Sequence, residues 1–300
     1  MKTYFLATRP WSFSVSALPV LVTTAGLFSM GYPVSWGMAL WATLGIVLFH
    51  AAGNTLSDYY DFTRGVDAAD TYGAKTLLAG EMTAPQMKRF AYTLFVIASL
   101  NGLAIAWASS WQLLWIGITG GIVAFFYSVL KFRAMGDVAI FINFGILPAL
   151  GTAIAVLPCS LFDTAYTDAL WLVLTFIPVT NAVLHANNTR DIPTDSRAHI
   201  RTLPMIIGLK ASRIIYCVEV LLPCFWAVVC ILAGKLPWGA LLILLSLPIA
   251  FGNCRTMMRF PADRDAINHL DEQTAKQQLI SSLLLFAGIM GTVGFKYFLA

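Results

Sequence analysis

The sequence predicts an all-α membrane protein with nine transmembrane helices. Of its 300 residues, 58% are hydrophobic and only 11% are charged, whereas about 25% of the residues of a soluble domain are charged. The apolar residues form nine continuous runs, and a membrane-spanning helix needs about 20 mostly apolar residues. Such runs do not fit the strands of a β-barrel, which alternate apolar and polar residues over about ten positions. We therefore expect residues 1–300 to form a single multi-pass domain.

The connections between these runs alternate between short, almost uncharged segments and segments that carry most of the charge. Runs two and three are separated by the charged stretch 57–89, and runs six and seven by 188–211. Lys131 and Arg133 lie between runs four and five, and a fourth charged connection separates runs eight and nine. The predicted spans are residues 12–30, 36–56, 90–108, 111–130, 138–158, 169–187, 212–232, 236–253 and 279–299.

The basic residues predict how the bundle is oriented. The N-terminus and the four charged connections carry 17 of the 19 Lys and Arg residues, and cytoplasmic connections of membrane proteins are enriched in these residues. The sequence thus predicts a protein of the cytoplasmic (inner) membrane, with the N-terminus in the cytoplasm and the C-terminus outside. Nucleic acid is not an expected partner, because 12 acidic residues accompany the basic ones and no nucleic-acid-binding motif is present.

Two acidic clusters follow apolar runs on the predicted cytoplasmic side, as a weak internal repeat with motifs at 54–67 and 187–195. Residues three or four apart share one face of a helix, so each motif offers a pair of carboxylates: Asp58 with Asp61, and Asp191 with Asp195. The second pair requires Pro193 to lie in a first turn or at a kink, because proline breaks the interior of a helix. Carboxylate oxygens suit Mg²⁺, which commonly joins them to substrate phosphates.

Basic residues in the same connections are suited to a phosphorylated substrate, since arginine and lysine both bind phosphate oxygens. They are Lys75, Lys131, Arg133, Arg190 and Arg201. Either these acids and bases merely pair on a solvated surface, where a pair contributes about 0–1 kcal/mol, or they form one site. Two matched clusters with flanking bases favour the second interpretation, a membrane enzyme that handles a diphosphate.

These motifs resemble those of the UbiA superfamily of intramembrane prenyltransferases. The segment Leu184-His185-Ala186-Asn187-Asn188-Thr189-Arg190-Asp191-x-x-x-Asp195 is similar to the family's second Asp-rich motif, and Ser57-Asp58-Tyr59-Tyr60-Asp61-Phe62-x-x-Gly65-x-Asp67 is similar to its first. Weaker similarities are Arg9-Pro10-Trp11, Lys75-Thr76-Leu77-x-x-Gly80, and Tyr127-Ser128-x-x-Lys131 followed by Gly136-Asp137. The pattern looks most like the branch that prenylates 1,4-dihydroxy-2-naphthoate, although Ser57 replaces a usual Asn and Lys75 a common Arg.

The resemblance implies a UbiA-like bundle with its active site on the cytoplasmic side. It also implies a Mg²⁺-dependent transfer of a polyprenyl group from polyprenyl diphosphate to the naphthoate, which releases CO₂ and diphosphate and gives demethylmenaquinol. The implied partners are the polyprenyl diphosphate, the aromatic acid and membrane lipid. The implied metal ligands are Asp58, Asp61, Asp67, Asp191 and Asp195, and the implied catalytic residues are Asp61, Asp191, Asp195 and Lys131. The residues implied to bind the diphosphate are Asn54, Ser57, Lys75, Arg133, Asn188, Arg190 and Arg201, with Arg9 on the acceptor's carboxylate.

Other interpretations stay open at the level of sequence. The acceptor of such an enzyme could instead be a hydroxybenzoate, homogentisate or a tetrapyrrole. A secondary transporter would explain the repeat, but transport sites usually lie near the membrane midplane rather than after the spans on one face. A membrane scaffold would explain only the topology. Four polar residues in or beside the spans fit either packing or a functional role: His50, Asp137 (alternatively a helix N-cap), His185 and Glu219.

Overall fold

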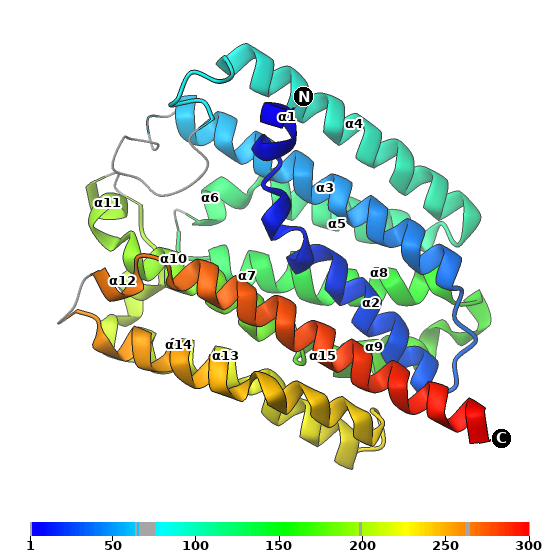
Figure 1. The fold of residues 1–300 in the computed structure, drawn as a ribbon. Coiled ribbons are helices and arrows are strands. Elements are labelled where there is room, and N and C mark those ends of the chain that lie inside the picture. Colours follow the sequence, from blue (N-terminus) through cyan, green and yellow to red (C-terminus); the bar gives the residue numbers. More distant parts are fainter. Residues whose placement is uncertain are drawn as a thin grey trace.

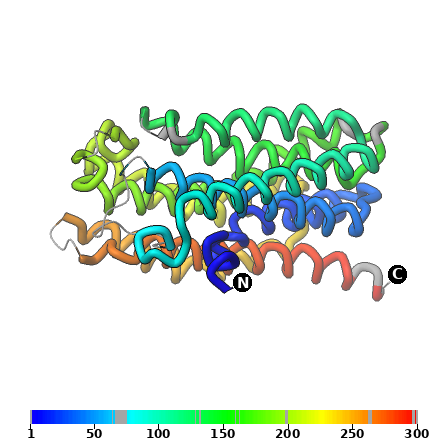
Figure 2. The backbone as a smooth tube through the Cα atoms, turned by 90° about the horizontal axis from the view of Figure 1, so that it is seen from above, coloured from blue at the N-terminus to red at the C-terminus, as the bar shows by residue number. Residues whose placement is uncertain are grey.

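The computed structural model describes residues 2–63, 65, 76–131, 133–197, 200–261 and 265–299. Within these ranges the only β-structure is one isolated bridge, so the predicted all-α class is confirmed. The long helices lie side by side along one common direction (Figure 1). Turned by 90°, they again form an elongated bundle (Figure 2).

The helices follow one another along the chain with short breaks. In the N-terminal half they are α1 (Lys2–Ala7), η1 (Pro10–Ser12), α2 (Ser14–Ser29), α3 (Trp36–Thr63), α4 (Ala84–Ala108), α5 (Gln112–Phe125), α6 (Tyr127–Lys131), α7 (Gly136–Phe141), η2 (Ile142–Ile146) and α8 (Leu147–Val156). In the C-terminal half they are η3 (Cys159–Leu161), α9 (Phe162–Val173), α10 (Ile177–Arg190), α11 (Ile192–Arg197), α12 (Leu203–Ile207), α13 (Leu209–Leu232), η4 (Trp238–Ser246), α14 (Leu247–Arg259), η5 (Asp265–Ile267) and α15 (Leu270–Leu299).

Six to eight of these helical segments are long and apolar enough to cross a membrane. Six are continuous, and two more are helix pairs that bend by 51° (Lys2–Ser12 with Ser14–Ser29) and by 44° (Asp163–Val173 with Ile177–Arg190). The remaining predicted span, 111–130, corresponds to the shorter apolar helix α5. The chain is therefore a multi-pass helical membrane protein, and the order of its segments follows the predicted order.

Several helices extend beyond the predicted spans. Helix α3 continues to Thr63 rather than to 56, so the first acidic motif lies on the helix and not in the following connection. Helix α15 begins at Leu270 rather than at 279, and one face of its polar first part is buried against other helices. Gln277 and Gln278 in that part have at most 1% of their surface exposed. A search for continuous apolar runs misses such a segment, since even the residues of its buried face are polar.

The core is made largely of small residues, which let membrane helices approach closely. Gly239 of η4 and Gly288 of α15 mark the closest approach, where a Cβ on either glycine would collide with the backbone carbonyl of the other. Large apolar side chains instead project outward from α4 and α5, as Trp107, Trp115 and Phe125 do. The bundle is thus tightly packed inside and apolar on the surface that would face lipid.

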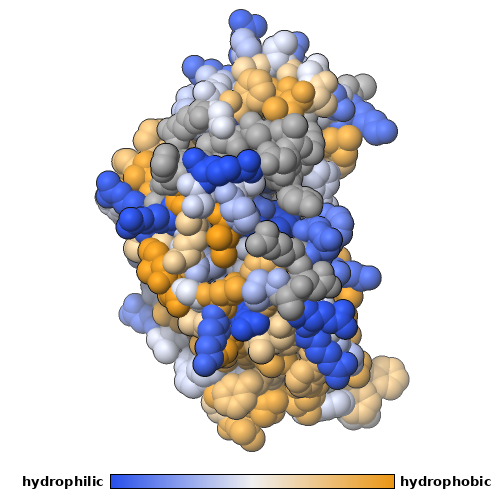
Figure 3. All heavy atoms as spheres, turned by 90° about the vertical axis from the view of Figure 1, so that its left-hand side faces the viewer, coloured by the Kyte–Doolittle hydropathy of each residue, from blue (hydrophilic) through white to orange (hydrophobic). Residues whose placement is uncertain are grey.

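The two ends of the bundle carry different connections. Helices α3, α10 and α14 end, and helices α4, α13 and α15 begin, at the end that also holds α11 and α12 (Figures 1 and 2). This end is called the motif end below. Hydrophilic side chains gather across the middle of its face (Figure 3). The described parts of the four charged connections therefore lie together at one end, as the charge distribution predicts.

Candidate active site

The first acidic motif occupies the last turns of α3. Asp58 has 3% of its surface exposed, and its carboxylate forms an ion pair with the guanidinium of Arg9. Asp61, three residues on and half-buried, accepts a hydrogen bond from Ser57 Oγ at 3.3 Å. The two carboxylates share one side of the helix, as their spacing predicts. They differ in environment, because Asp58 is buried against an arginine and Asp61 is only half-buried.

The N-terminal segment is held against this motif by polar contacts. The side-chain amide of Asn54 donates hydrogen bonds to the backbone oxygen of Thr8 at 3.0 Å and to Ser12 Oγ at 3.2 Å. Arg9 has a left-handed backbone conformation (φ 54°, ψ 60°), and Pro10 follows it in η1. The chain therefore turns at Arg9 in a way that brings its guanidinium to Asp58. About one third of the Arg9 side chain remains exposed (32%), so it is open to a further anion.

The second acidic motif spans the junction between α10 and α11. Helix α10 ends at Arg190, and the N–H of Asp191, its C-cap residue, donates to the backbone oxygen of Asn187 at 2.9 Å. Pro193 lies in the first turn of α11, where its missing N–H leaves no hydrogen bond unmade. The N–H of Asp195 donates to the backbone oxygen of Asp191 at 2.8 Å. The predicted first-turn position of Pro193 is confirmed, and the two aspartates stay one helical turn apart.

Arg190 ties this motif to the start of α15. Its guanidinium contacts Asp191 at 2.8 Å and Asp271 at 2.7 Å, and it also donates to the side chain of Asn187. Only 6% of the Arg190 side chain is exposed, so it is largely enclosed by these partners. Sequence reasoning missed Asp271. The sequence does contain a sign of its role. Asp271 is an acidic residue in the first turn of the last helix, on the membrane side where the second acidic motif is also predicted.

Two of the predicted diphosphate-binding arginines come together at the motif end. Arg133, after α6, and Arg201, before α12, are joined by an isolated parallel β-bridge, and both are exposed. Arg201 also lines an open hollow of about 360 Å³ together with Ser196, Ile200 and Met205. Ser196 directly follows Asp195, so this hollow adjoins the second acidic motif.

The other predicted site residues are either buried or outside the described part of the chain. Asn188 is buried on α10, with 4% of its surface exposed. Lys75 and Asp67 lie outside the described residues, as does the side chain of Lys131 at the end of α6. Their predicted roles in diphosphate binding, metal binding and catalysis stay predictions.

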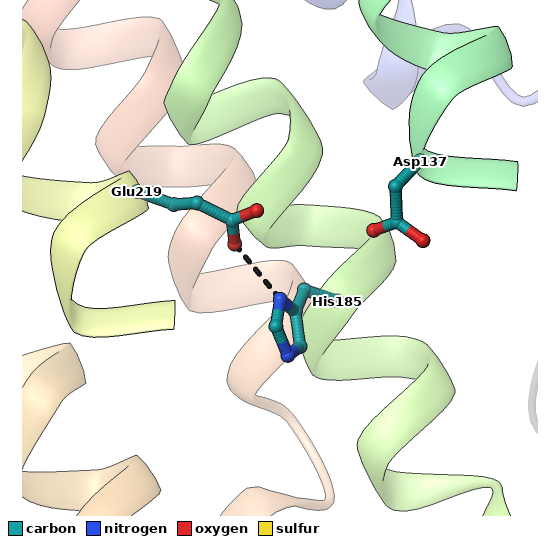
Figure 4. A group of neighbouring side chains, drawn as sticks. All are labelled: Asp137, His185 and Glu219. Carbon is teal, nitrogen blue, oxygen red and sulfur yellow. Dashed lines mark hydrogen bonds and ion pairs between the residues drawn. The ribbon is translucent and has the colours of Figure 1, made fainter. Parts of the chain in front are cut away.

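A second polar group lies deeper in the bundle, near the motif end. Asp137 of α7, His185 of α10 and Glu219 of α13 point toward one another (Figure 4). Among the described residues this is the one group of three or more metal-ligating side chains whose ligand atoms all lie within 4.8 Å of one another. Asp137 is not an N-cap, since the N-cap of α7 is Met135. In the sequence these three residues are separate polar positions in or beside different spans. Only the packing of the helices brings them together.

The arrangement at the motif end suits an amphiphilic anion. Carboxylates, which attract a divalent cation, lie on two helices, and exposed arginines lie beside them. An apolar bundle adjoins the same end, so a ligand with a charged head and a hydrocarbon tail would find both environments.

Comparisons with known proteins give the family. The model of the UbiA prenyltransferase family matches residues 17–269. UbiA prenyltransferase domain-containing protein 1 of Danio rerio is 32% identical over 301 residues, which cover 96% of this chain and 83% of that protein. The Homo sapiens protein of the same name is 32% identical over 295 residues, with 96% and 83% covered.

Solved structures agree in fold. A UbiA homolog from Aeropyrum pernix K1 has a TM-score of 0.69 at 15% identity, with 93% of this chain and 98% of that chain covered. A UbiA homolog from Archaeoglobus fulgidus, solved with GPP and Mg²⁺ bound, has a TM-score of 0.56 at 15% identity, with 94% and 99% covered. The family match over most of the sequence, together with this helical fold and its two acidic motifs, means that the chain belongs to the UbiA prenyltransferase family.

Proposed function

We propose that this protein transfers a prenyl group from a prenyl diphosphate to 1,4-dihydroxy-2-naphthoate, in a reaction that requires Mg²⁺. The observation that carries the proposal is the position of both Asp-rich motifs at one end of a UbiA-type bundle. The A. fulgidus homolog, bound to GPP and Mg²⁺, supports a prenyl diphosphate and Mg²⁺ as ligands here.

The residues at the motif end fit a magnesium ion. Asp58, Asp61, Asp191 and Asp195 supply hard oxygen donors, which Mg²⁺ prefers. Asp58 and Asp195 are buried, with 3% and 7% of their surfaces exposed, whereas Asp61 and Asp191 are partly exposed, so the four carboxylates offer oxygen atoms both inside the bundle and at its end. When bound there, Mg²⁺ supplies positive charge that stabilises the diphosphate as it leaves.

The chain's own residues hold and orient the substrates. Arg201 and Arg133, exposed beside the second motif, offer donors to phosphate oxygens. Arg190 holds the side chain of Asp191 in place through two hydrogen bonds, of 2.8 and 3.1 Å. The apolar helices next to the motif end would surround the prenyl tail and exclude water from the allylic carbon, which would otherwise be captured by hydroxide or water.

The proposed acceptor rests on the resemblance of the two Asp-rich motifs to those of the naphthoate branch. In the proposed reaction the bond between the allylic carbon and the diphosphate oxygen breaks, and its electron pair leaves with diphosphate. The ring carbon that bears the carboxylate attacks the allylic carbon, and the bond to the carboxylate then breaks. Its electrons restore the aromatic ring, so CO₂ leaves and the product is a demethylmenaquinol. Arg9, one-third exposed beside Asp58, is the proposed partner of the acceptor carboxylate before that step.

The proposed topology places the motif end in the cytoplasm. It counts α5 as the ninth span beside the six continuous and two bent segments. The excess of Lys and Arg in the connections at the motif end supports this orientation. It leaves the C-terminus outside and the protein in the inner membrane.

The test is an assay of the purified protein with Mg²⁺, several prenyl diphosphates and a panel of aromatic acids. Products are identified by mass. We expect one prenylated product, from the naphthoate, with the mass of the decarboxylated compound. Turnover of 4-hydroxybenzoate alone would overturn the acceptor, and diphosphate hydrolysis without a prenylated product would overturn the transfer.

A further inference from the structure

We propose that Asp137, His185 and Glu219 form a binding site for one divalent transition-metal ion such as Zn²⁺. The site lies inside the bundle, separate from the Asp-rich motifs. It would join helices α7, α10 and α13, which are far apart in the sequence. The proposal goes beyond the prenyl-transfer reaction and does not depend on it.

The three side chains converge from three helices on one point (Figure 4). One ligand atom from each lies within 4.8 Å of the other two. In the tetrahedral geometry usual for Zn²⁺, ligand atoms about 2.0–2.2 Å from the ion are about 3.3–3.6 Å apart. Rotations of the three side chains that bring their ligand atoms to these separations would complete the site.

The buried carboxylate of Asp137 is a second observation that points to a bound cation, independent of the convergence of the three side chains. It has 7% of its surface exposed, and neither oxygen of its carboxylate has a hydrogen-bond partner among the described residues. Its backbone oxygen accepts a hydrogen bond from Asn181 Nδ2 at 3.2 Å, which fixes the start of α7 against α10. A buried carboxylate left in this state is costly, and a cation between it and His185 would remove that cost.

His185 is held in the orientation that a metal ligand needs. Its ring is fully buried, its Nε2 lies 2.8 Å from Ser212 Oγ, and its Nδ1 faces Glu219 at 3.0 Å. Thr189 in turn lies 3.2 Å from the Ser212 hydroxyl. If Nε2–H donates to Ser212, the Nδ1 lone pair points at the centre of the cluster. A partner of this kind on the second ring nitrogen is usual for metal-ligating histidines.

Charge balance also favours a divalent ion. Among the described residues, the charged groups that act on the Glu219 carboxylate are His185 and Asp137, both members of the cluster. With both carboxylates ionised and the imidazole neutral, as metal ligands must be, the cluster would carry a charge of about −2, which one divalent cation would neutralise. Isolated charges inside a membrane bundle are costly and are usually paired.

The donor set selects the class of metal. Mg²⁺ takes oxygen ligands and keeps much of its water, whereas imidazole nitrogen with carboxylates suits Zn²⁺ or a neighbouring transition metal. His185 precedes Asp191 by six residues on α10, which corresponds to about 9 Å along a helix. The two sites are therefore separate, and each attracts a different ion.

The test uses untagged, detergent-purified protein that has been stripped with EDTA and then titrated with Zn²⁺ in the absence of substrate. We expect about one tightly bound equivalent per chain after gel filtration, measured by elemental analysis, and a Zn²⁺-dependent rise in the unfolding temperature. Asp137→Asn and Glu219→Gln should each weaken binding by at least about tenfold, and Ser212→Ala by about 10- to 100-fold.

Three matched controls should bind Zn²⁺ like the wild type. Asp168→Asn removes a carboxylate at the opposite end, where Asp168 pairs with Lys235. Asp195→Asn alters the second acidic motif, and Cys217→Ser with Cys254→Ser removes two thiols that pack against the cluster around Tyr216 and Val220, the latter adjacent to Glu219 in the chain. Binding that these controls abolish, or that Asp137→Asn leaves unchanged, would overturn the proposal.

A spectroscopic measurement keeps the proposal testable if a variant fails to fold. Co²⁺ in place of Zn²⁺ should give the wild type visible d–d bands of a low-symmetry site with nitrogen and oxygen ligands. A spectrum of free aqueous Co²⁺ in the presence of folded wild-type protein would overturn the site.

Discussion

At the scale of single residues, the first motif depends on an arginine 49 positions away in the chain. The Arg9 guanidinium pairs with Asp58, whose side chain is 4% exposed, while Arg9 itself is 32% exposed. Removing one partner of such a pair leaves a buried charge without compensation, which costs more than the pair contributes. Arg9 therefore stabilises the apo protein, whatever it also does with an acceptor.

A double-mutant cycle on this pair separates the two effects. We expect Arg9→Ala to lower the free energy of unfolding by about 1–3 kcal/mol, because Asp58 is left buried and charged. The same change in an Asp58→Asn background should cost less, since the charge is gone. Thermal unfolding in detergent, without substrates, measures both. Strict additivity of the two single changes would contradict a direct interaction.

The half-buried carboxylates of the motifs, those of Asp61 and Asp191, should matter for turnover more than for folding. Asp61→Ala and Asp191→Ala are expected to lower the prenyl-transfer rate by about 100-fold or more, because both remove charge that helps to hold the diphosphate. The folded fraction after gel filtration should not change. Asp163→Ala is the matched control, an exposed aspartate on α9 at the opposite end. Wild-type rates in either motif variant would remove that residue from the site.

At the scale of elements, the sequence predicts the local structure of the two motifs well. It does not predict the contacts that distant parts of the chain make with them. The spacing of Asp58 and Asp61 correctly indicates a helix, and Pro193 correctly indicates a first turn. The ion pair between Arg190 and Asp271 cannot be predicted from local spacing, because the two residues are 81 positions apart in the chain. The start of α15 was missed for a related reason, since its buried polar residues do not form an apolar run.

Asp271 should support the second motif from outside it. Asp271→Ala removes one of the carboxylates around the nearly buried Arg190 guanidinium, so we expect a loss of about 1–3 kcal/mol in stability. The neighbouring Glu272, whose side chain is 76% exposed, gives a matched control. Glu272→Ala should change stability by no more than about 0.5 kcal/mol. Equal unfolding temperatures for the two variants would show that the Arg190–Asp271 pair does not hold the motif.

At the scale of the whole molecule, composition was enough to predict an all-helical multi-pass protein. The bends of 51° and 44° were not predictable from apolar runs, since composition carries no information on direction. The meeting of Asp137, His185 and Glu219 was not predictable either, because it needs the packing of three helices. The position of the charged connections at one end of the bundle was predictable, because every second connection of a multi-pass protein lies on the same side of the membrane.

The orientation of the bundle can be tested by cysteine labelling in a background without the five native cysteines. We expect Glu81→Cys and Arg259→Cys, at the motif end, to react with a membrane-impermeant reagent only from the cytoplasmic side. Ser160→Cys and Asp163→Cys should react only from outside. The motive is the excess of basic residues at the motif end. Labelling of Glu81→Cys and Arg259→Cys from opposite sides would separate the ends of α3 and α14 across the membrane.

The central claim is that the two acidic motifs serve one Mg²⁺-dependent prenyl transfer to a naphthoate. Its most direct test is a product balance with 1,4-dihydroxy-2-naphthoate labelled with ¹³C in the carboxyl group. Equal amounts of prenylated product, diphosphate and ¹³CO₂ are expected with Mg²⁺, and none of the three with EDTA. A prenylated product that keeps the label, or undiminished turnover in EDTA, would contradict the account.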